Sequence, residues 1–260
     1  MIGLGTYAFF WEHSDRVDEP LSLTGAFERT RAADVDLFQI CDYAPLERMT
    51  VAEVRAAARV ARDLGLTVEL GTKGIAPEHL TRFLRFAELF DARLIRTMVD
   101  GGSDVHGAAV ALRRILPSFE AAGVTLALET YEQIATAELV ALVRGLGSPR
   151  VGICLDPANV VARLERPRAC VEEAADVVVG IHVKDFAFAR QPGWVGFTYS
   201  GAPMGTGLHD YPHLRETVRP AERGINEVVE HWLPWQGDAQ TTVRTERDWT
   251  RTTLEYLRSL

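Results

Sequence analysis

Short runs of apolar and β-branched residues alternate with longer helical stretches along the whole chain, and this alternation most constrains the fold. The runs occupy residues 2–8, 37–42, 66–71, 94–99, 124–129, 151–156, 178–184 and 225–230. A strand followed by a helix, repeated, predicts parallel strands joined by right-handed crossovers. Eight such units in 260 residues predict an α/β fold, a single (β/α)8 TIM barrel that spans residues 1–260 as one domain. A doubly wound open sheet is the alternative, because the order of elements does not show closure.

The helical stretches carry recognisable start and stop signals. Thr50 and Glu53 form a capping box, in which each side chain satisfies a free amide of the first turn. Gly65 occupies the position just after that helix, where a left-handed residue commonly ends a helix. Pro77 suits the first turn of the next helix. These signals support the division into repeating units.

The segment 185–225 interrupts the repeat and is rich in glycine and proline. This composition predicts a loop. It would follow the seventh strand at the barrel face where active sites lie, so we expect it to be functional. Its aromatic residues, Trp194, Phe197 and Tyr199, are expected either to stack on a substrate or to pack the loop.

Composition excludes several classes of partner. With 28 Lys and Arg against 36 Asp and Glu, the formal charge is −8, which disfavours nucleic acid and anionic membranes. No run is long and apolar enough for a membrane span, and no signal peptide is evident at the start. The three cysteines, Cys41, Cys154 and Cys170, have wide, irregular spacing that fits neither a disulfide framework nor a thiolate zinc site. We therefore expect a cytoplasmic protein.

The parity of side chains along the last four strands predicts where they point, because alternate residues face opposite sides of a strand. In residues 124–129, the bulky Val and Leu residues share one parity and must meet the helices. Applied to all four strands, this reasoning sends four polar side chains into the barrel lumen, near the carboxyl ends of the strands: Glu129, Asp156, His182 and Glu230.

Three converging carboxylates repel one another, and a divalent cation removes that conflict. Oxygen ligands with one imidazole suit Mn²⁺, our preferred ion, as well as Mg²⁺, Co²⁺ or Zn²⁺. The alternative is that each strand-end carboxylate simply caps a helix or anchors a loop. Three carboxylates and one histidine on successive strands, all with lumen parity, favour one divalent metal site.

Further polar residues are candidates for binding substrate. Lys184 shares the parity of His182 and could neutralise a substrate anion, or could instead pair with Asp185 or Glu230. The remaining candidates from parity or position are Arg96, Lys73, Glu69, Glu132 and His209. Arg96, Lys73 and Glu69 could instead form ion pairs in the core. Glu132 could simply start a helix, and His209 could be an exposed loop histidine.

The strand ends resemble those of the sugar phosphate isomerase/epimerase superfamily with the xylose isomerase-like TIM barrel. The similar segments are 126–129, 153–156, 181–185 and 228–230. The resemblance implies that the four lumen residues hold one divalent metal and that Glu129 and Glu230 act as the acid/base pair. Ketose epimerases of this superfamily often carry a His three residues after the strand-six Asp, whereas this chain has Asn159, which can bind a hydroxyl but cannot titrate.

These observations favour a metal-dependent isomerase or epimerase that acts on a small sugar, keto-sugar or sugar acid through an enediolate or enolate. The alternative is a metal-dependent decarboxylase of a 3-oxo sugar acid, which forms the same enolate without a base. The possible cations Lys73, Arg96 and Lys184 and the presence of Asn159 favour that alternative. A non-catalytic sugar-binding barrel is a third hypothesis. The sequence leaves the oligomeric state open, with a homo-oligomer among the options.

Overall fold

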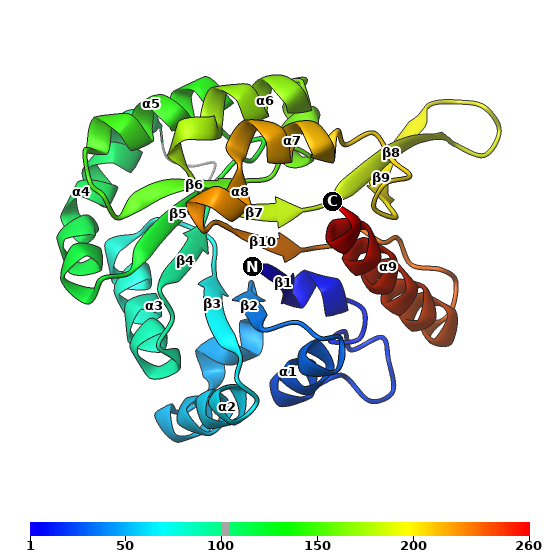
Figure 1. Ribbon diagram of the computed structural model, residues 1–260, viewed down its shortest axis with the longest axis horizontal. Helices are drawn as coiled ribbons and strands as arrows, with labels where there is room; N and C mark the ends of the chain where they lie inside the picture. The colour runs from blue at the N-terminus through cyan, green and yellow to red at the C-terminus, as the bar shows by residue number, and fades with distance from the viewer. Residues whose placement is uncertain (100–103) are drawn as a thin grey trace.

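The computed structural model describes residues 1–99 and 104–260, and its centre is a closed barrel of eight parallel strands (Figure 1). Around the barrel the order is β1-β10-β7-β6-β5-β4-β3-β2. The strands are β1 (Ile2–Gly5), β2 (Leu37–Cys41), β3 (Thr67–Gly71), β4 (Leu94–Thr97), β5 (Thr125–Glu129), β6 (Val151–Leu155), β7 (Val178–Val183) and β10 (Asn226–Val229). Because β1 pairs with both β2 and β10, the predicted barrel is confirmed and the open-sheet alternative is wrong.

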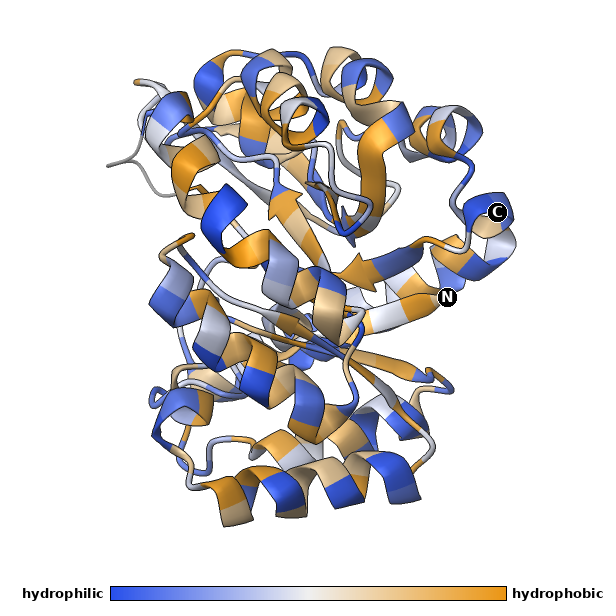
Figure 2. Ribbon diagram, turned by 90° about the vertical axis from the view of Figure 1, so that its left-hand side faces the viewer, coloured by the Kyte–Doolittle hydropathy of each residue, from blue (hydrophilic) through white to orange (hydrophobic). Residues whose placement is uncertain are grey.

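Helices cover the outside of the barrel. They are α1 (Leu23–Ala32), α2 (Val51–Asp63), α3 (Pro77–Phe90), α4 (Val105–Ala122), α5 (Thr136–Leu146), α6 (Pro167–Ala174), α7 (Tyr211–Val218), α8 (Pro220–Arg223) and α9 (Ala239–Ser259). Four short 3₁₀ helices join them: η1 (Thr6–Phe9), η2 (Ala44–Arg48), η3 (Asn159–Arg163) and η4 (Ala175–Val177). Apolar and polar segments alternate along the helices in Figure 2, as expected when one face packs on the strands. Within the described residues, no helix has the length and apolar character of a membrane span.

The predicted helix signals lie at the helix ends. Thr50 caps α2 by accepting the Glu53 amide, and the Glu53 carboxylate accepts the Thr50 amide at 2.7 Å. Gly65 has φ +72°, the left-handed conformation expected just after a helix. Pro77 is the first residue of α3. The predicted first strand was too long, because the chain turns into η1 after Gly5.

The segment 185–225 is not only a loop, which corrects the prediction. It contains an antiparallel hairpin of β8 (Asp185–Arg190) and β9 (Phe197–Ala202), followed by α7 and α8. The Asp185 carboxylate fixes the hairpin, since it accepts the backbone amides of four residues at 2.8–3.0 Å: Phe186, Gly205, Gly207 and His209. Gly207 is required there, because an added Cβ would lie 2.2 Å from Asp185 Oδ1.

Strand parity separates the core from the lumen as predicted. Leu126 and Leu128 of β5 are fully buried in the main hydrophobic cluster, which lies between the strands and the helices. A small separate cluster of Leu94, Ala127 and Cys154 lies in the barrel interior. Cys154 therefore contributes to packing, and the polar groups gather toward the carboxyl ends of the strands.

Candidate metal centre and active site

The structure brings the four predicted lumen residues together. Glu129 ends β5, Asp156 follows β6, His182 lies in β7 and Glu230 follows β10. Each side chain is at most 2% exposed, and each offers a ligand atom within 4.8 Å of the others. Convergence from four strands is what parallel strand ends in a barrel provide, because they all finish at the same face.

Positive groups lie among these carboxylates. His182 Nδ1 is 3.1 Å from Glu129 Oε1 and 3.4 Å from Glu230 Oε2. Lys184 Nζ is 2.7 Å from Asp156 Oδ2 and 3.1 Å from Glu230 Oε2. Burial alone would lower the pKa of the Lys184 ammonium, but the Asp156 and Glu230 carboxylates raise it above its ordinary value. Lys184 is therefore charged at neutral pH. It pairs with Glu230, which was one of its two predicted alternative partners, whereas the other, Asp185, binds backbone amides.

The donor set fits a divalent cation. Three carboxylates and one imidazole supply oxygen and nitrogen ligands of the kind that Mn²⁺, Mg²⁺, Co²⁺ and Zn²⁺ accept. Glu230 Oε1 is buried and has no hydrogen-bond partner among the described residues. A buried carboxylate oxygen without a partner is costly, and a bound cation would satisfy it.

A buried chain of hydrogen bonds orients His182. Its Nε2 lies 2.9 Å from Gln39 Oε1, and the amide of Gln39 donates to Glu69 Oε2 at 3.1 Å. Asn226 in turn donates to Glu69 Oε1 at 2.6 Å. Because an amide oxygen only accepts, His182 Nε2 carries a proton and donates it to Gln39. Burial alone would lower the pKa of the imidazole, but the surrounding acidic groups raise it well above its ordinary value. Nδ1, which faces the carboxylates, is the nitrogen that would bind a cation in place of a proton. Sequence analysis missed Gln39, although its lumen parity on the second strand was a usable signal.

Arg96 lies between the four lumen residues and Asp42 at the end of β2. Its guanidinium forms an ion pair with Glu129 and lies 3.3 Å from Asp42 Oδ2. It also donates to the Thr72 carbonyl at 2.9 Å. Burial alone would raise the pKa of the Glu129 carboxyl, but Arg96, with His182 and Lys184, holds it well below its ordinary value. Glu129 is therefore ionised.

Asp42 is a second residue that sequence analysis missed. It has the parity of the outward-facing residues of β2, but a left-handed backbone with φ +50° turns the chain at this point. Its carboxylate then meets Arg96 and accepts from Tyr7 Oη at 3.0 Å. A cavity of about 420 Å³ opens beside it, lined in part by Tyr7, Phe10 and Tyr43. Asp42 thus connects Arg96 to the wall of this cavity.

Asn159 and Lys73 also lie near the barrel mouth. Asn159 Nδ2 donates to Glu129 Oε1 at 3.0 Å and to the Thr130 carbonyl at 3.2 Å. Lys73 has a side chain that is 60% exposed, with Nζ 3.5 Å from Asp42 Oδ2. Lys73 therefore lies toward solvent, whereas Asn159 contacts Glu129 among the four lumen residues.

The other three predicted substrate ligands lie in different surroundings. Glu69 is buried in the chain that supports His182, bonded to Gln39 and Asn226. His209 is buried with Nδ1 2.8 Å from the Lys184 carbonyl, so it is not the exposed loop histidine that formed the alternative. Glu132 is half-buried in the loop after β5, and its carbonyl accepts from Arg163.

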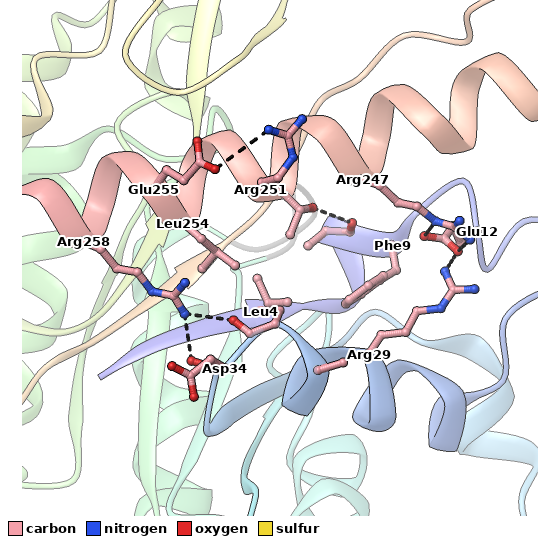
Figure 3. A pocket seen from close by; sticks show the side chains of 14 residues that line it. Leu4, Phe9, Glu12, Arg29, Asp34, Arg247, Arg251, Leu254, Glu255 and Arg258 are labelled. Carbon is pink, nitrogen blue, oxygen red and sulfur yellow. Dashed lines mark hydrogen bonds and ion pairs between the residues drawn. The ribbon is translucent and has the colours of Figure 1, made fainter.

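Another cavity, of about 670 Å³, lies outside the barrel between α1 and α9 (Figure 3). Its floor is apolar, with Leu4, Phe9 and Leu254, and arginines stand at its edge. Arg247 pairs with Glu12 at 2.8 Å, and Arg258 donates to the Asp34 carbonyl at 2.8 Å. The metal cluster contributes nothing to this cavity, so it is not part of the candidate active site.

Known proteins share this combination of fold and strand ends. The family model described as the xylose isomerase-like TIM barrel matches residues 27–260. The chain belongs to the xylose isomerase-like TIM barrel family. The resemblance inferred from the strand ends is thereby confirmed.

Relatives within this family differ in how similar they are. The chain is 52% identical over 259 residues to 3-oxo-isoapionate decarboxylase of Pectobacterium atrosepticum, covering 98% of this chain and 94% of the relative. A D-psicose 3-epimerase from Clostridium cellulolyticum H10 has a TM-score of 0.75 at 14% identity, covering 99% and 98% of the two chains. A Mycobacterium smegmatis barrel in complex with magnesium has a TM-score of 0.72 at 15% identity, covering 96% and 95%. At these low identities the two structures support the fold.

Proposed function

We propose that this chain is a divalent metal-dependent decarboxylase of a 3-oxo sugar acid. The observation that carries the proposal is the 52% identity to 3-oxo-isoapionate decarboxylase over nearly the full length of both chains. The decarboxylase was the alternative in the sequence analysis, and this relative now favours it over the isomerase or epimerase. The substrate is a small sugar acid, and three buried free cysteines support a reducing compartment, the cytoplasm.

Glu129, Asp156, His182 and Glu230 would hold the ion, for which we propose Mn²⁺. When bound, the ion supplies a positive charge that stabilises the oxyanion formed beside the 3-oxo carbon. In the reaction the bond between the carboxylate carbon and the neighbouring carbon breaks, and CO₂ leaves. The electron pair of that bond forms the enolate, which then takes one proton from solvent or an acid group.

We assign the binding of the negatively charged substrate and enolate to Lys184 and Arg96. The Lys184 ammonium, fixed by Asp156 and Glu230, would hold the enolate oxygen while solvent supplies the proton. The Arg96 guanidinium, fixed by Asp42 and the Thr72 carbonyl, would hold the substrate on the opposite wall. Lys73 at the mouth would attract the substrate anion, and Asn159 would keep Glu129 in place.

The surroundings of Glu129 argue for decarboxylation over proton transfer between two carboxylates. Arg96, Asn159 and His182 all contact this carboxylate, so little of it is free to remove a carbon-bound proton. Decarboxylation requires no such base. The isomerase or epimerase remains the second candidate, because Glu230 Oε1 has no hydrogen-bond partner in the described chain and could act as a base.

The test is turnover in D₂O with Mn²⁺, measured by CO₂ release and by NMR. With a 3-oxo sugar acid we expect stoichiometric CO₂, one solvent deuteron in the product and no exchange in recovered substrate. Keto-sugars should show neither conversion nor exchange. Deuterium exchange of a keto-sugar without any CO₂ from 3-oxo acids would establish the second candidate instead. The surface variant Glu255→Gln on α9 serves as the control for handling and metal loading.

A further inference from the structure

The hairpin of β8 and β9, residues 185–202, forms an arm that projects from the barrel (Figure 1). Its register places Phe186 opposite Gly201, Phe188 opposite Tyr199 and Arg190 opposite Phe197. Residues directly opposite in an antiparallel pair point to the same side, so one side of the arm is aromatic. The other side carries small residues, with Ala187 opposite Ser200 and Ala189 opposite Thr198.

The aromatic side runs continuously from the candidate active site outward. Lys184 Nζ lies 4.4 Å from the ring centre of Trp232, which packs against Tyr199 at 5.6 Å. Tyr199 then contacts Phe188 at 5.0 Å. Phe186, at the base, is buried, whereas Phe188 and Phe197 farther out are 50% and 61% exposed. The aromatic side therefore extends beyond the surface that the barrel itself covers.

The base of the arm is held at three points. Tyr199 Oη donates to the Ala158 carbonyl at 2.6 Å, and the Gly201 amide donates to the Trp232 carbonyl at 3.1 Å. Asp185 binds the backbone on both sides of the hairpin. These contacts hold the base of the arm against the barrel, while its outer aromatic side chains stay exposed.

The outer part of the arm has the area and charge of an interface between like chains. Phe188, Trp194, Val195 and Phe197 are 50–83% exposed, which corresponds to about 500 Å² of apolar surface at roughly 150–250 Å² for a whole large side chain. Two such surfaces give about 1,000 Å², the lower limit for a specific interface. Residues 186–202 contain no acidic residue, although the chain has 36 and a net charge of −8. Like-charge repulsion between copies is therefore least at the arm.

We propose that a second copy of this chain covers the arm, with the two aromatic sides packed against each other around a two-fold axis. Such an interface uses the same residues on both copies, as two-fold symmetry requires. Trp194 at the tip, 78% exposed, is the expected hot spot, because large aromatic side chains carry most of the energy of interfaces. Arg190 lies over Phe197 at 4.5 Å and keeps the stacking geometry of the tip.

The test is the mass of the purified chain by light scattering after size exclusion, over the low-micromolar range. We expect twice the 28.8 kDa of one chain. Trp194→Asp should weaken association about 30-fold for each of the two symmetric contacts, or roughly 1,000-fold together, and yield monomer. The matched control is Val110→Asp, which changes an exposed valine of α4 and should remain dimeric.

Tryptophan fluorescence gives a second measurement. Dilution of the wild type should shift the emission of Trp194 to longer wavelength, and the Trp194→Phe variant should lose that shift. Three outcomes would overturn the proposal: a wild-type monomer throughout, a Trp194→Asp variant that stays dimeric with an unchanged melting temperature, or a monomer whose Trp194 emission responds only to substrate. The last outcome would make the arm a lid.

Discussion

Replacing Gln39 with leucine tests whether the buried chain behind His182 prepares the metal site. Gln39 accepts from His182 Nε2 at 2.9 Å and donates to Glu69 Oε2 at 3.1 Å. Leucine has a similar volume but makes neither hydrogen bond. Without the amide, the imidazole can exchange its proton between the two nitrogens and rotate. Nδ1 then no longer presents its lone pair toward Glu129 and Glu230 in every molecule. We expect metal affinity to fall.

The magnitude follows from the groups that lose partners. Loss of the hydrogen bond behind a metal-binding histidine costs about 10- to 100-fold in affinity, or about 1.4 to 2.8 kcal/mol. Two buried polar groups without partners lower the free energy of unfolding by about 1–3 kcal/mol each. At roughly 2 °C per kcal/mol for a chain of this size, the melting temperature should fall by about 4–12 °C.

Calorimetric titration of the metal-free protein with Mn²⁺ measures the affinity, and thermal unfolding measures the stability. The control is Thr136→Val, which removes a partly buried 2.6 Å hydrogen bond from Thr136, at the start of α5, to Glu165. It should lower the melting temperature while leaving the Mn²⁺ affinity within about twofold of wild type. An unchanged Mn²⁺ affinity in Gln39→Leu would refute the reasoning.

Three further outcomes are expected. Mn²⁺ at about 100 times its dissociation constant should stabilise the chain by about 2.7 kcal/mol, which is roughly 5 °C in melting temperature. Glu230→Gln should lose most of this shift, and equal shifts in both proteins would remove Glu230 from the site. Lys184→Met should lower kcat for a 3-oxo acid at least about 100-fold, which steady-state kinetics would measure. It should not weaken metal binding, measured by titration, because the ammonium beside the carboxylates competes with the cation. Burial raises the pKa of the Cys170 thiol to about 12 and raises those of Cys41 and Cys154, so a thiol reagent at pH 8 should label none in the native chain and three after denaturation.

The barrel was predictable because its signal is repeated in every unit. A capping box at Thr50, a left-handed Gly65 and a proline at the start of α3 each mark a boundary, and errors in one unit do not change the period. The hairpin arm was not predictable from the same signals. Its structure depends on the Asp185 carboxylate, which accepts backbone amides as far away as that of His209, 24 residues along the chain. Glycine and proline counts describe the turns of such a segment but carry no information on that contact.

The convergence of the four lumen residues was predictable because parity and strand end coincide for them, but parity alone does not give height along the barrel. Glu69 has lumen parity, and the register pairs the following residue, Leu70, with Ile95 and Ile95 with Leu126. Glu69 is therefore level with Thr125, four residues before Glu129 on β5. At that depth it meets Asn226 at the start of β10 and supports His182 from below.

For Asp42 the opposite holds: its position at the end of β2 gives the correct height along the barrel, but strand parity assigns its side chain to the wrong face. It follows β2 at the level of the mouth, but its residue number assigns it to the outward side. The left-handed backbone at φ +50° reverses that assignment, at a cost of about 1–2 kcal/mol for a residue other than glycine. The contacts with Arg96 and Tyr7 Oη offset the cost. Strained residues are typical of binding sites, and Asp42 holds Arg96 beside the four lumen residues. The parity rule therefore fails at a position where the proposed chemistry needs a carboxylate.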